Sequence, residues 1–291
     1  MERFNLSNRW LTFAERTVAL EYESLEVAEV VEFLFHDIPT QADILPHITF
    51  HLACHEGRFS LHMGDDLHYK GNDRAMFASS LLTEVGYHLA DTCDGGLFFH
   101  GAGLSWKNQG ILLPGSSGMG KTTLTTWLLA QGFSYLSDEF IYIPQNSQKG
   151  YGFARPLNLK PTARPVLQHL LNFEKHADQI LSHAEADIVP VHLIKSAKTD
   201  LTGFENLLGL NVAPLKLILF PHYQAAQPFT AQKLSNAQTS WHLMQTLINA
   251  RNLPGHGLPE ITRLVKTIPA YKISYNEFGR LDQQLIKWLE S

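Results

Sequence analysis

The chain contains an apolar strand pattern that runs directly into a glycine-rich segment: Gly110-Ile111-Leu112-Leu113-Pro114-Gly115-Ser116-Ser117-Gly118-Met119-Gly120-Lys121-Thr122-Thr123. The helix-like segment Leu124 to Ala130 follows it. Between strand and helix, Gly115 to Thr122 satisfies the pattern G-x-x-x-x-G-K-[ST] in the structural context that this pattern requires. Its glycines let the backbone curl so that successive N–H groups point at phosphate oxygens, and the positive end of the helix adds a favourable field. The segment therefore predicts a phosphate-binding P-loop.

Two side chains of this loop have specific expected roles. Lys121 places a positive charge near the terminal phosphates of a bound nucleotide, and the Thr122 hydroxyl is the natural ligand of Mg²⁺. The loop predicts a nucleotide with Mg²⁺ and does not say which nucleotide it is; ATP and Mg²⁺ are the cofactors that the kinase hypothesis given below implies. The alternative is a glycine-rich turn that matches the pattern by chance, and the flanking strand and helix argue against it. The predicted nucleotide-binding residues are Gly115, Ser116, Ser117, Gly118, Met119, Gly120, Lys121, Thr122 and Thr123.

A pair of acidic residues, Asp138 and Glu139, follows the helix of the loop within a strand-like segment. In many P-loop ATPases the acid that binds magnesium comes much later, at the end of an apolar strand. Here the later strand, Leu215 to Phe220, is followed by Pro221-His222 and by no acid. We therefore predict that Asp138 and Glu139 serve in proton transfer and metal binding, with Glu139 as a magnesium ligand. The alternative is a pair of solvent-facing acids at a strand edge.

His100 ends a strand-like segment just upstream of the loop. An imidazole at this place could hold a carboxylate or relay a proton, which makes His100 a candidate catalytic residue. The alternative is a hydrogen-bonded histidine of the core, since a lone histidine among apolar residues usually has that role.

Composition excludes several classes of protein. With 44% hydrophobic and 18% charged residues among 291, the chain is neither a disordered tail nor a coiled coil. The formal net charge of -5 is opposite in sign to the basic surface that wraps nucleic acid, so no nucleic-acid partner is expected. Cys54 and Cys93 form no CxxC pair and are too few for a disulfide framework, which points to a reducing cytosol. No stretch approaches the roughly 18 apolar residues of a membrane span, so we expect a cytoplasmic protein without a membrane partner.

The order of the predicted elements divides the chain into two parts. Residues 1–95 predict a smaller α+β region, in which Asp73 caps a helix from about Arg74 to Ala90. Residues 96–291 predict a second module that contains the loop. Its later elements are a helix near Val166 to His176, a loop from about Leu201 to Pro214, the strand Leu215 to Phe220, and a final helix Leu281 to Leu289.

Three of these features together resemble the catalytic domain of bacterial HPr kinase/phosphorylase and, more closely, the HPr-kinase-related proteins of the kinase A type. They are His100 before the loop, the loop itself, and Leu136-Ser137-Asp138-Glu139 after its helix, in the order and approximate spacing of the family. The resemblance covers about residues 96 to 290. It implies a mixed α/β fold with a P-loop kinase domain of the HPr-kinase/PEP-carboxykinase-like type over residues 96–291, preceded by an N-terminal region of unknown role.

The resemblance also implies roles for single residues. Lys121 becomes the phosphate-contacting lysine, Asp138 the acid that handles the proton of the acceptor hydroxyl, and His100 its neighbour. The segment Ala154 to Lys160 resembles an arginine-proline and leucine-lysine segment of the related proteins. It makes two further residues candidate contacts of phosphate or substrate, and a surface turn with ordinary charges is the alternative. These two residues are Arg155 and Lys160.

The chain departs from the kinase/phosphorylase at two points. Glu139 stands where a second aspartate is common, and the sequence lacks the segment Glu-Ile-Arg-Gly that supplies further metal and phosphate contacts in that enzyme. Neither phosphorylase activity nor HPr as the substrate is therefore implied. The family forms rings, so the resemblance implies a homo-oligomer.

The leading functional hypothesis is an ATP-dependent kinase that transfers phosphate to a serine-type hydroxyl of a protein or peptide. Mg²⁺ and Lys121 would neutralise charge on the transferring group, while Asp138 orients and deprotonates the acceptor. One alternative is a nucleotide-dependent switch or binding module in which hydrolysis drives association with a partner. The other is a kinase of a small metabolite, because a P-loop does not identify its acceptor.

Overall fold

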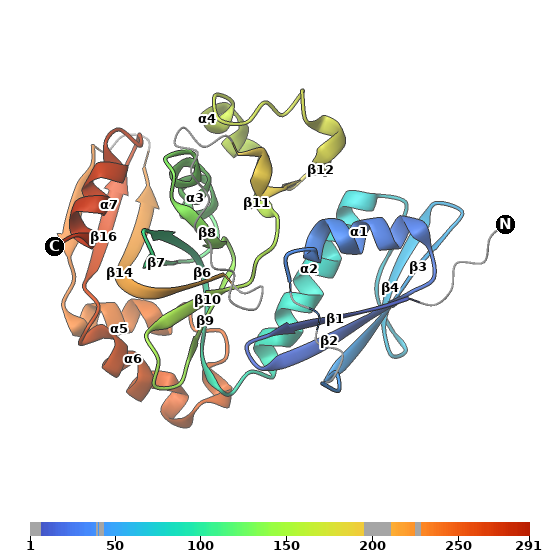
Figure 1. Cartoon of the computed structure of the whole chain (residues 1–291), viewed down its shortest axis with the longest axis horizontal. Coiled ribbons are helices and arrows are strands. Elements are labelled where there is room, and N and C mark those ends of the chain that lie inside the picture. The colour runs from blue at the N-terminus through green and yellow to red at the C-terminus, as the bar shows by residue number, and fades with distance from the viewer. Residues whose placement is uncertain (1–6, 39, 41–43, 195–210, 225–227) are drawn as a thin grey trace.

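The computed structural model of the chain describes residues 7–38, 40, 44–194, 211–224 and 228–291. It is a mixed α/β protein with a five-stranded, an eight-stranded and a three-stranded sheet. The five-stranded sheet and its two helices form one side of the molecule, and the larger sheet with its helices forms the other (Figure 1). Within the described ranges, no helix combines the length and the apolar character needed to cross a membrane.

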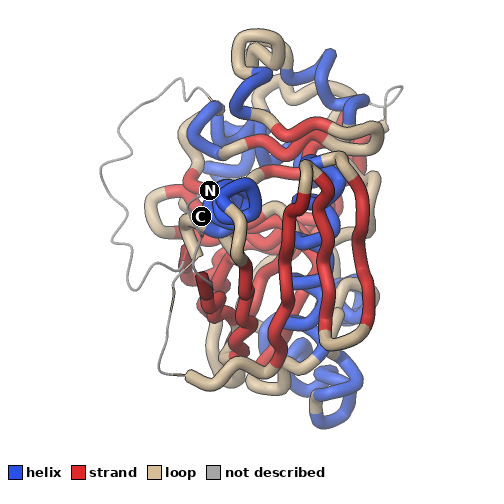
Figure 2. The backbone as a smooth tube through the Cα atoms, turned by 90° about the vertical axis from the view of Figure 1, so that its right-hand side faces the viewer, coloured by secondary structure: helices blue, strands red, loops and turns tan. Residues whose placement is uncertain are grey.

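The N-terminal region is a sheet with two helices packed on it. Its strands lie in the order β1-β2-β3-β4-β5, and α1 connects the parallel strands β2 and β3. Figure 2 views the molecule from the side where this sheet faces the reader. Ser24 caps α1, and the Asp73 carboxylate accepts hydrogen bonds from the first turn of α2, as predicted. The elements are β1 (Ser7–Phe13), β2 (Arg16–Tyr22), α1 (Leu25–Phe35), β3 (Ile48–His55), β4 (Arg58–Met63), β5 (Asp66–Gly71) and α2 (Arg74–Asp91).

The larger sheet has the strand order β10-β9-β6-β7-β14-β16-β15, with β8 also paired to β6. Strands β7, β14 and β16 are parallel neighbours, whereas β6 and β7 form an antiparallel hairpin. Strand β10 pairs with both β9 and β14, so the sheet closes on itself there. The strands are β6 (Gly96–Trp106), β7 (Gln109–Pro114), β8 (Ser134–Ser137), β9 (Phe140–Pro144), β10 (Lys149–Gly152), β14 (Asn211–Tyr223), β15 (Thr230–Lys233) and β16 (Ala270–Tyr275).

Helices cover both faces of this sheet because its central strands are apolar on both sides. Ile111 and Leu113 of β7 pack in one core with α3 and α7, while Leu112 between them packs in another core with α5 and α6. This alternation is the two-residue period of a strand. The helices are α3 (Lys121–Ala130), α5 (Asn236–Met244), α6 (Leu258–Val265) and α7 (Leu281–Leu289).

A smaller lobe leaves the sheet after β10 and rises above α3 (Figure 1). Its strands have the order β11-β13-β12, and Asp187 of β13 receives two hydrogen bonds from Arg164, at 2.7 and 2.5 Å. This pair fixes the helical segment to the sheet. The elements are β11 (Leu157–Leu159), a 3₁₀ turn (Pro161–Ala163), α4 (Arg164–Leu167), a 3₁₀ turn (Ala177–Gln179), β12 (Leu181–Ser182), β13 (Asp187–Val189) and a 3₁₀ turn (Val191–Leu193).

Two predicted elements differ from the structure. The helix predicted near Val166 to His176 is wrong, because α4 ends at Leu167 and the chain continues in turns. The Asn172 side chain accepts a hydrogen bond from the backbone N–H of Lys175, and such a local bond competes with helix continuation. The strand predicted across the acid pair is interrupted, since Asp138 and Glu139 form a bend between β8 and β9.

Other predicted elements are confirmed, with small differences at their ends. Strand β14 is longer than the predicted Leu215 to Phe220, and α7 has the predicted bounds. Most of the loop predicted from Leu201 to Pro214 lies outside the described residues, and residues 211–214 belong to β14.

The N-terminal region shares a hydrophobic core with the rest of the chain. The core between its sheet and helices also contains Phe98, Tyr142, Phe153 and Ile188 from the second part. Asn249, which is 1% exposed, donates from Nδ2 to the carbonyls of Cys93 and Gly96. Its Oδ1 accepts from the N–H of Phe98. The junction near residue 95 is therefore well packed and hydrogen-bonded.

Candidate functional site

The Gly115 to Thr122 segment forms the predicted connection between a strand and a helix. Strand β7 ends at Pro114, and α3 begins at Lys121. Gly118 and Gly120 have φ angles of 88° and 87°, a left-handed conformation that glycine adopts at little cost. The loop therefore needs glycine at these two positions to turn into the helix.

Lys121 folds back over this loop. Its side chain is largely buried, and Nζ donates to the carbonyls of Gly115 and Ser116, at 2.5 and 3.0 Å. Burial lowers the pKa of Lys121, and the nearby carboxylates of Glu139 and Asp138 oppose this shift. The ammonium group is thus held inside the curl of the loop, close to the acid pair.

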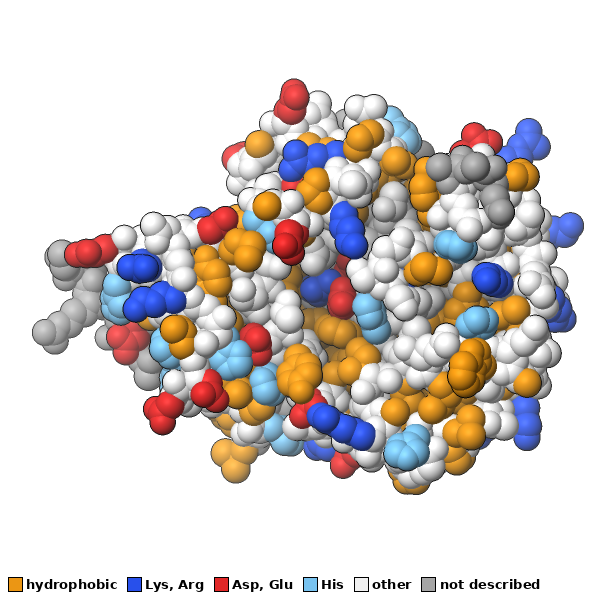
Figure 3. All heavy atoms as spheres, turned by 180° about the vertical axis from the view of Figure 1, so that it is seen from behind, with side chains coloured by type: hydrophobic (Ala, Val, Ile, Leu, Met, Phe, Trp, Pro, Cys, Tyr) orange, Lys and Arg blue, Asp and Glu red, His pale blue; other side chains and the backbone are white. Residues whose placement is uncertain are grey.

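A cavity of about 1020 Å³ opens in front of the loop. The space-filling view shows a hollow in the middle of the back face, with basic, acidic and histidine side chains gathered around it (Figure 3). Loop residues in its wall are Ser117, Gly118, Gly120, Lys121, Thr122 and Thr123. The other predicted site residues in the wall are His100, Asp138, Glu139 and Lys160. Gly115, Ser116, Met119 and Arg155 are not part of the wall.

The acid pair is presented by a bend that Ser137 holds. The Ser137 hydroxyl accepts hydrogen bonds from the N–H groups of Glu139 and Phe140, at 3.2 and 3.1 Å. The Glu139 carbonyl in turn accepts from the N–H of Gly101 on β6, at 2.9 Å. Strands β8 and β9, on either side of the bend, both pair with the single strand β6. The bend is therefore held at both ends.

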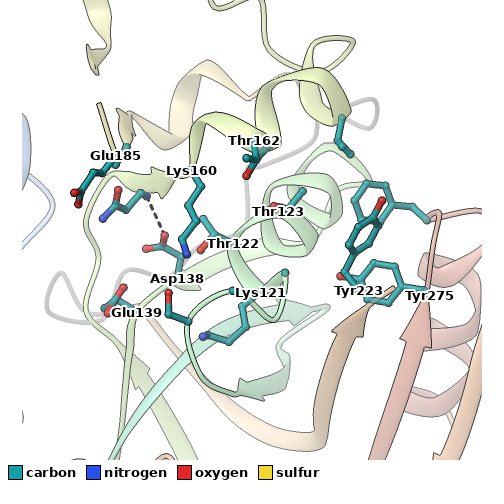
Figure 4. Close-up of a pocket in the computed structure, with 18 of the residues that line it drawn as sticks. Lys121, Thr122, Thr123, Asp138, Glu139, Lys160, Thr162, Glu185, Tyr223 and Tyr275 are labelled. Carbon is teal, nitrogen blue, oxygen red and sulfur yellow. Dashed lines mark hydrogen bonds between the residues drawn. The ribbon is translucent and has the colours of Figure 1, made fainter. Parts of the chain in front are cut away.

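Asp138 is buried in the cavity wall, and each of its carboxylate oxygens has a partner. Its Oδ1 accepts from the Tyr135 hydroxyl at 3.1 Å and lies 3.4 Å from Nε of Arg155. Its Oδ2 accepts from the N–H of Asn158 at 3.0 Å, the bond drawn in Figure 4. Burial raises the pKa of Asp138, and the charge of Arg155 opposes the rise. A carboxylate with a raised pKa is a better proton acceptor than an ordinary aspartate.

Arg155 lies behind the two acids and joins them. Its Nη2 donates to Glu139 Oε2 at 2.8 Å, while its Nε faces Asp138. Burial lowers the pKa of Arg155, but Asp138 and Glu139 outweigh this effect and the net shift is upward. The guanidinium therefore stays charged and orients both carboxylates from outside the cavity wall.

The end of the cavity that holds Asp138 and Glu139 is called the acid end here. Glu139 and His100 are its more accessible residues. The Glu139 side chain is 30% exposed, and its Oε1 lies 3.5 Å from Nε2 of His100. Burial lowers the pKa of His100, with Glu139 opposing the shift and Lys121 adding to it. Lys160 extends into the same end of the cavity from the smaller lobe (Figure 4).

The oxygen atoms at this end suit Mg²⁺. The Thr122 hydroxyl and the carboxylates of Asp138 and Glu139 line the same cavity, and all are hard oxygen donors. Among the described residues, no group of three or more His, Cys, Asp or Glu side chains could hold a metal by itself. Magnesium at nucleotide sites usually takes one or two carboxylates and completes its shell with waters and substrate phosphates. Thr122 and Glu139 have the oxygen donors that a Mg²⁺ ligand needs, and their assignment as metal ligands stays a prediction.

Several cavity residues gave no recognisable signal in the sequence. Ser79 reaches the wall from α2 of the N-terminal region, and His183 and Glu185 come from the turn between β12 and β13. Tyr223 and Phe278 belong to segments that meet only in the folded chain. Only the alternation of residues 157 to 160 could have indicated that Asn158 faces the same side as Lys160.

The scan of protein-family models gives no match to this chain, and the search of curated proteins gives none either.

Proposed function

We propose that this chain is an ATP-dependent kinase that transfers the γ-phosphate to a serine-type hydroxyl of a protein or peptide. The observation that carries this proposal is the meeting of a buried loop lysine, Lys121, with the carboxylates of Asp138 and Glu139 in one cavity. A phosphate-binding loop beside a proton acceptor is the minimum machinery of phosphoryl transfer. The resemblance of the sequence to the HPr-kinase-related proteins supports the choice of a serine-type acceptor.

The proposed reaction is a direct displacement. The acceptor oxygen attacks the γ-phosphorus, the bond from that phosphorus to the bridging oxygen of ADP breaks, and the hydroxyl proton passes to Asp138. Asp138 suits this step because its raised pKa favours taking the proton and its hydrogen bonds fix its direction. Arg155 acts as a positioning residue that keeps both acids in place.

The donor phosphates would occupy the curl of the loop. There they accept hydrogen bonds from backbone N–H groups at the start of α3, and the Nζ of Lys121 exchanges the carbonyls of Gly115 and Ser116 for phosphate oxygens. Thr122 and Glu139 would hold Mg²⁺, whose positive charge would lower the cost of charge build-up on the transferring group. Charge neutralisation and alignment then account for most of the rate enhancement.

One labelling experiment tests the proposal. The purified chain is incubated with γ-labelled ATP, Mg²⁺ and a lysate of its own cells, with the Lys121→Ala variant as the matched control. Label on a single protein or peptide, lost in the variant, is the expected outcome. Label on a small molecule would identify a metabolite kinase, and release of free phosphate alone would identify a nucleotide-dependent switch.

A further inference from the structure

The end of the cavity opposite the acids is aromatic. Tyr223, Tyr275 and Phe278, here called the aromatic wall, line the cavity together with Gly120 and Thr123. Figure 4 shows Tyr223 and Tyr275 beyond Thr123, on the other side of the loop from Asp138 and Glu139. The proposed function uses only the loop and the acid end, so the aromatic wall has no role in it.

The wall is built by the parallel strands beside the loop. Strand β14 lies between β7 and β16, and Tyr223 and Tyr275 are register partners at the carboxyl ends of β14 and β16. The loop leaves the carboxyl end of β7, so all three features meet at one edge of the sheet. In α/β proteins, ligand sites lie beyond the carboxyl ends of the parallel strands, in closed barrels as well as in open sheets.

Ring contacts and one backbone hydrogen bond connect the aromatic wall to the loop and to α3. The Tyr223 and Tyr275 rings meet edge to face at 5.9 Å, and Phe278 stacks on Trp127 of α3 at 4.8 Å. The N–H of Tyr223 donates to the Met119 carbonyl at 3.4 Å. Tyr275 is buried behind, whereas the Tyr223 residue is 45% exposed. An exposed ring held by such contacts can take a flat aromatic group with a reduced ordering cost.

The direction of the loop decides what reaches this wall. In a loop of this pattern, the lysine marks the side of the β- and γ-phosphates. Lys121 faces the acid end, so the γ-phosphate points toward Asp138 and Glu139, and the rest of the donor leaves on the side of Thr123. A base-free polyphosphate would end before the aromatic wall.

We propose that the aromatic wall is the nucleobase subsite, and that the ring of Tyr223 selects a nucleoside triphosphate over a base-free polyphosphate as the phosphate donor. This inference rests on the proposed function, because it takes the loop to bind the phosphates. Tyr223 and Phe278 offer ring surface on one side of the base, and Ala163 and Val166 of the smaller lobe also line the cavity. Stacking on the ring tolerates several bases, since every base has a flat π-face.

Titration calorimetry with two ligands, ATP and inorganic tripolyphosphate, each with Mg²⁺, tests this subsite on the full chain. The parental chain should bind ATP more tightly than tripolyphosphate. Tyr223→Ala should weaken ATP binding by roughly 5- to 100-fold and leave tripolyphosphate binding unchanged. Tyr223→Phe should retain ATP binding, because the ring and not the hydroxyl provides the contact. Trp241→Ala, which removes a ring 66% exposed on α5, is the matched control and should change neither affinity.

The outcomes separate this inference from the proposed function. If the parental chain binds ATP and tripolyphosphate equally well, the loop binds phosphate but the aromatic subsite is refuted. Equal weakening of both ligands by Tyr223→Ala also refutes it, since the ring would then only support the loop. If the parental chain binds neither ligand, the proposed function is refuted, and the nucleobase subsite is refuted as well because it rests on that function.

Discussion

Asp138 and Glu139 are adjacent in sequence but differ in their surroundings. The Asp138 side chain is 0% exposed and has partners on both oxygens, whereas Glu139 is 30% exposed and reaches the cavity directly. This contrast gives the two acids different expected roles, proton transfer for Asp138 and metal binding for Glu139. Two nearly isosteric substitutions can separate these roles.

We expect Asp138→Asn to reduce phosphoryl transfer by roughly 100- to 10,000-fold with little change in ATP affinity, because it removes the proton acceptor and leaves the loop intact. Glu139→Gln should instead weaken Mg²⁺ binding, so that a higher Mg²⁺ concentration restores part of the rate. Turnover across a magnesium series, with ATP binding by calorimetry and thermal unfolding as the check on folding, measures both. Parental turnover in Asp138→Asn would remove its assignment as the base.

Arg155 influences the pKa of Asp138. Burial raises the pKa of Asp138, and Arg155 is the largest influence that lowers it. Arg155→Met removes the lowering charge, so the pKa of Asp138 should rise further and the acid limb of the kcat profile should move to higher pH. Arg155→Lys keeps a charge and should move the limb less. An acid limb at the parental pH in both variants would show that another group titrates there.

At the scale of the elements, the loop and the aromatic wall meet at Gly120. A Cβ at Gly120 would lie 3.1 Å from the Tyr275 hydroxyl and 3.2 Å from Tyr223 Cβ, in a backbone conformation that strains any L-residue. A Cβ at Gly118, which has nearly the same φ, would meet nothing within 4 Å. The two glycines therefore form a matched pair for substitution.

Both alanine variants carry the left-handed backbone cost, about 1–2 kcal/mol, but only Gly120→Ala also places its Cβ in tight contact with the aromatic wall. We expect Gly120→Ala to lose most ATP binding, and Gly118→Ala to lose less. Calorimetric ATP affinities of the two variants, with circular dichroism to confirm folding, make the comparison. Equal ATP affinities of Gly118→Ala and Gly120→Ala would mean that the contact between residue 120 and the aromatic wall does not affect nucleotide binding by the loop.

The sequence predicted correctly those helices and strands whose ends depend on neighbouring residues, such as a capping side chain or an apolar run. The α2 helix begins at its predicted cap, Asp73, and the strand before the loop is where its apolar run places it. The helix predicted from Val166 failed because the lobe is organised by the distant pair Arg164 and Asp187 and by the Asn172 turn. Periodicity carries no information about such contacts.

The same limit applies to the candidate site. Lys121, Asp138, Glu139 and His100 could be predicted because the motif and the acid pair lie near one another in the sequence, and the structure brings all four to one cavity. The aromatic wall could not be predicted, since Tyr223 and Tyr275 become neighbours only when β14 and β16 pair. Apolar residues at strand ends are too common to mark a binding site by themselves.

For the whole molecule, Asn249 links the two parts of the chain. It is buried and satisfies the backbone of Cys93, Gly96 and Phe98 at the junction. Asn249→Ala should lower the free energy of unfolding by roughly 3 kcal/mol, because the buried Gly96 carbonyl and Phe98 N–H lose their bonds to this side chain, whereas the Cys93 carbonyl keeps a bond from Asn252. Asn252→Ala removes bonds to Asp91 and Cys93 at a half-buried position, where water can replace them, and should cost about 1 kcal/mol.

Urea unfolding measures both variants. Because the parts share one core, fluorescence and circular dichroism should report a single coincident transition in the parental chain. Two separate transitions would contradict the shared core, and equal losses in the two asparagine variants would contradict the role of burial at Asn249.

The shared core also constrains how the protein is made. A nascent chain that has left the ribosome only through α2 lacks Phe98, Tyr142, Phe153 and Ile188, which complete the packing of its first sheet and helices. Asn249, whose side chain hydrogen-bonds the backbone at the junction, is synthesised still later. Apolar side chains of the first 95 residues thus stay open to solvent until Ile188 has been synthesised, and such transiently exposed apolar surface makes a nascent chain prone to aggregate.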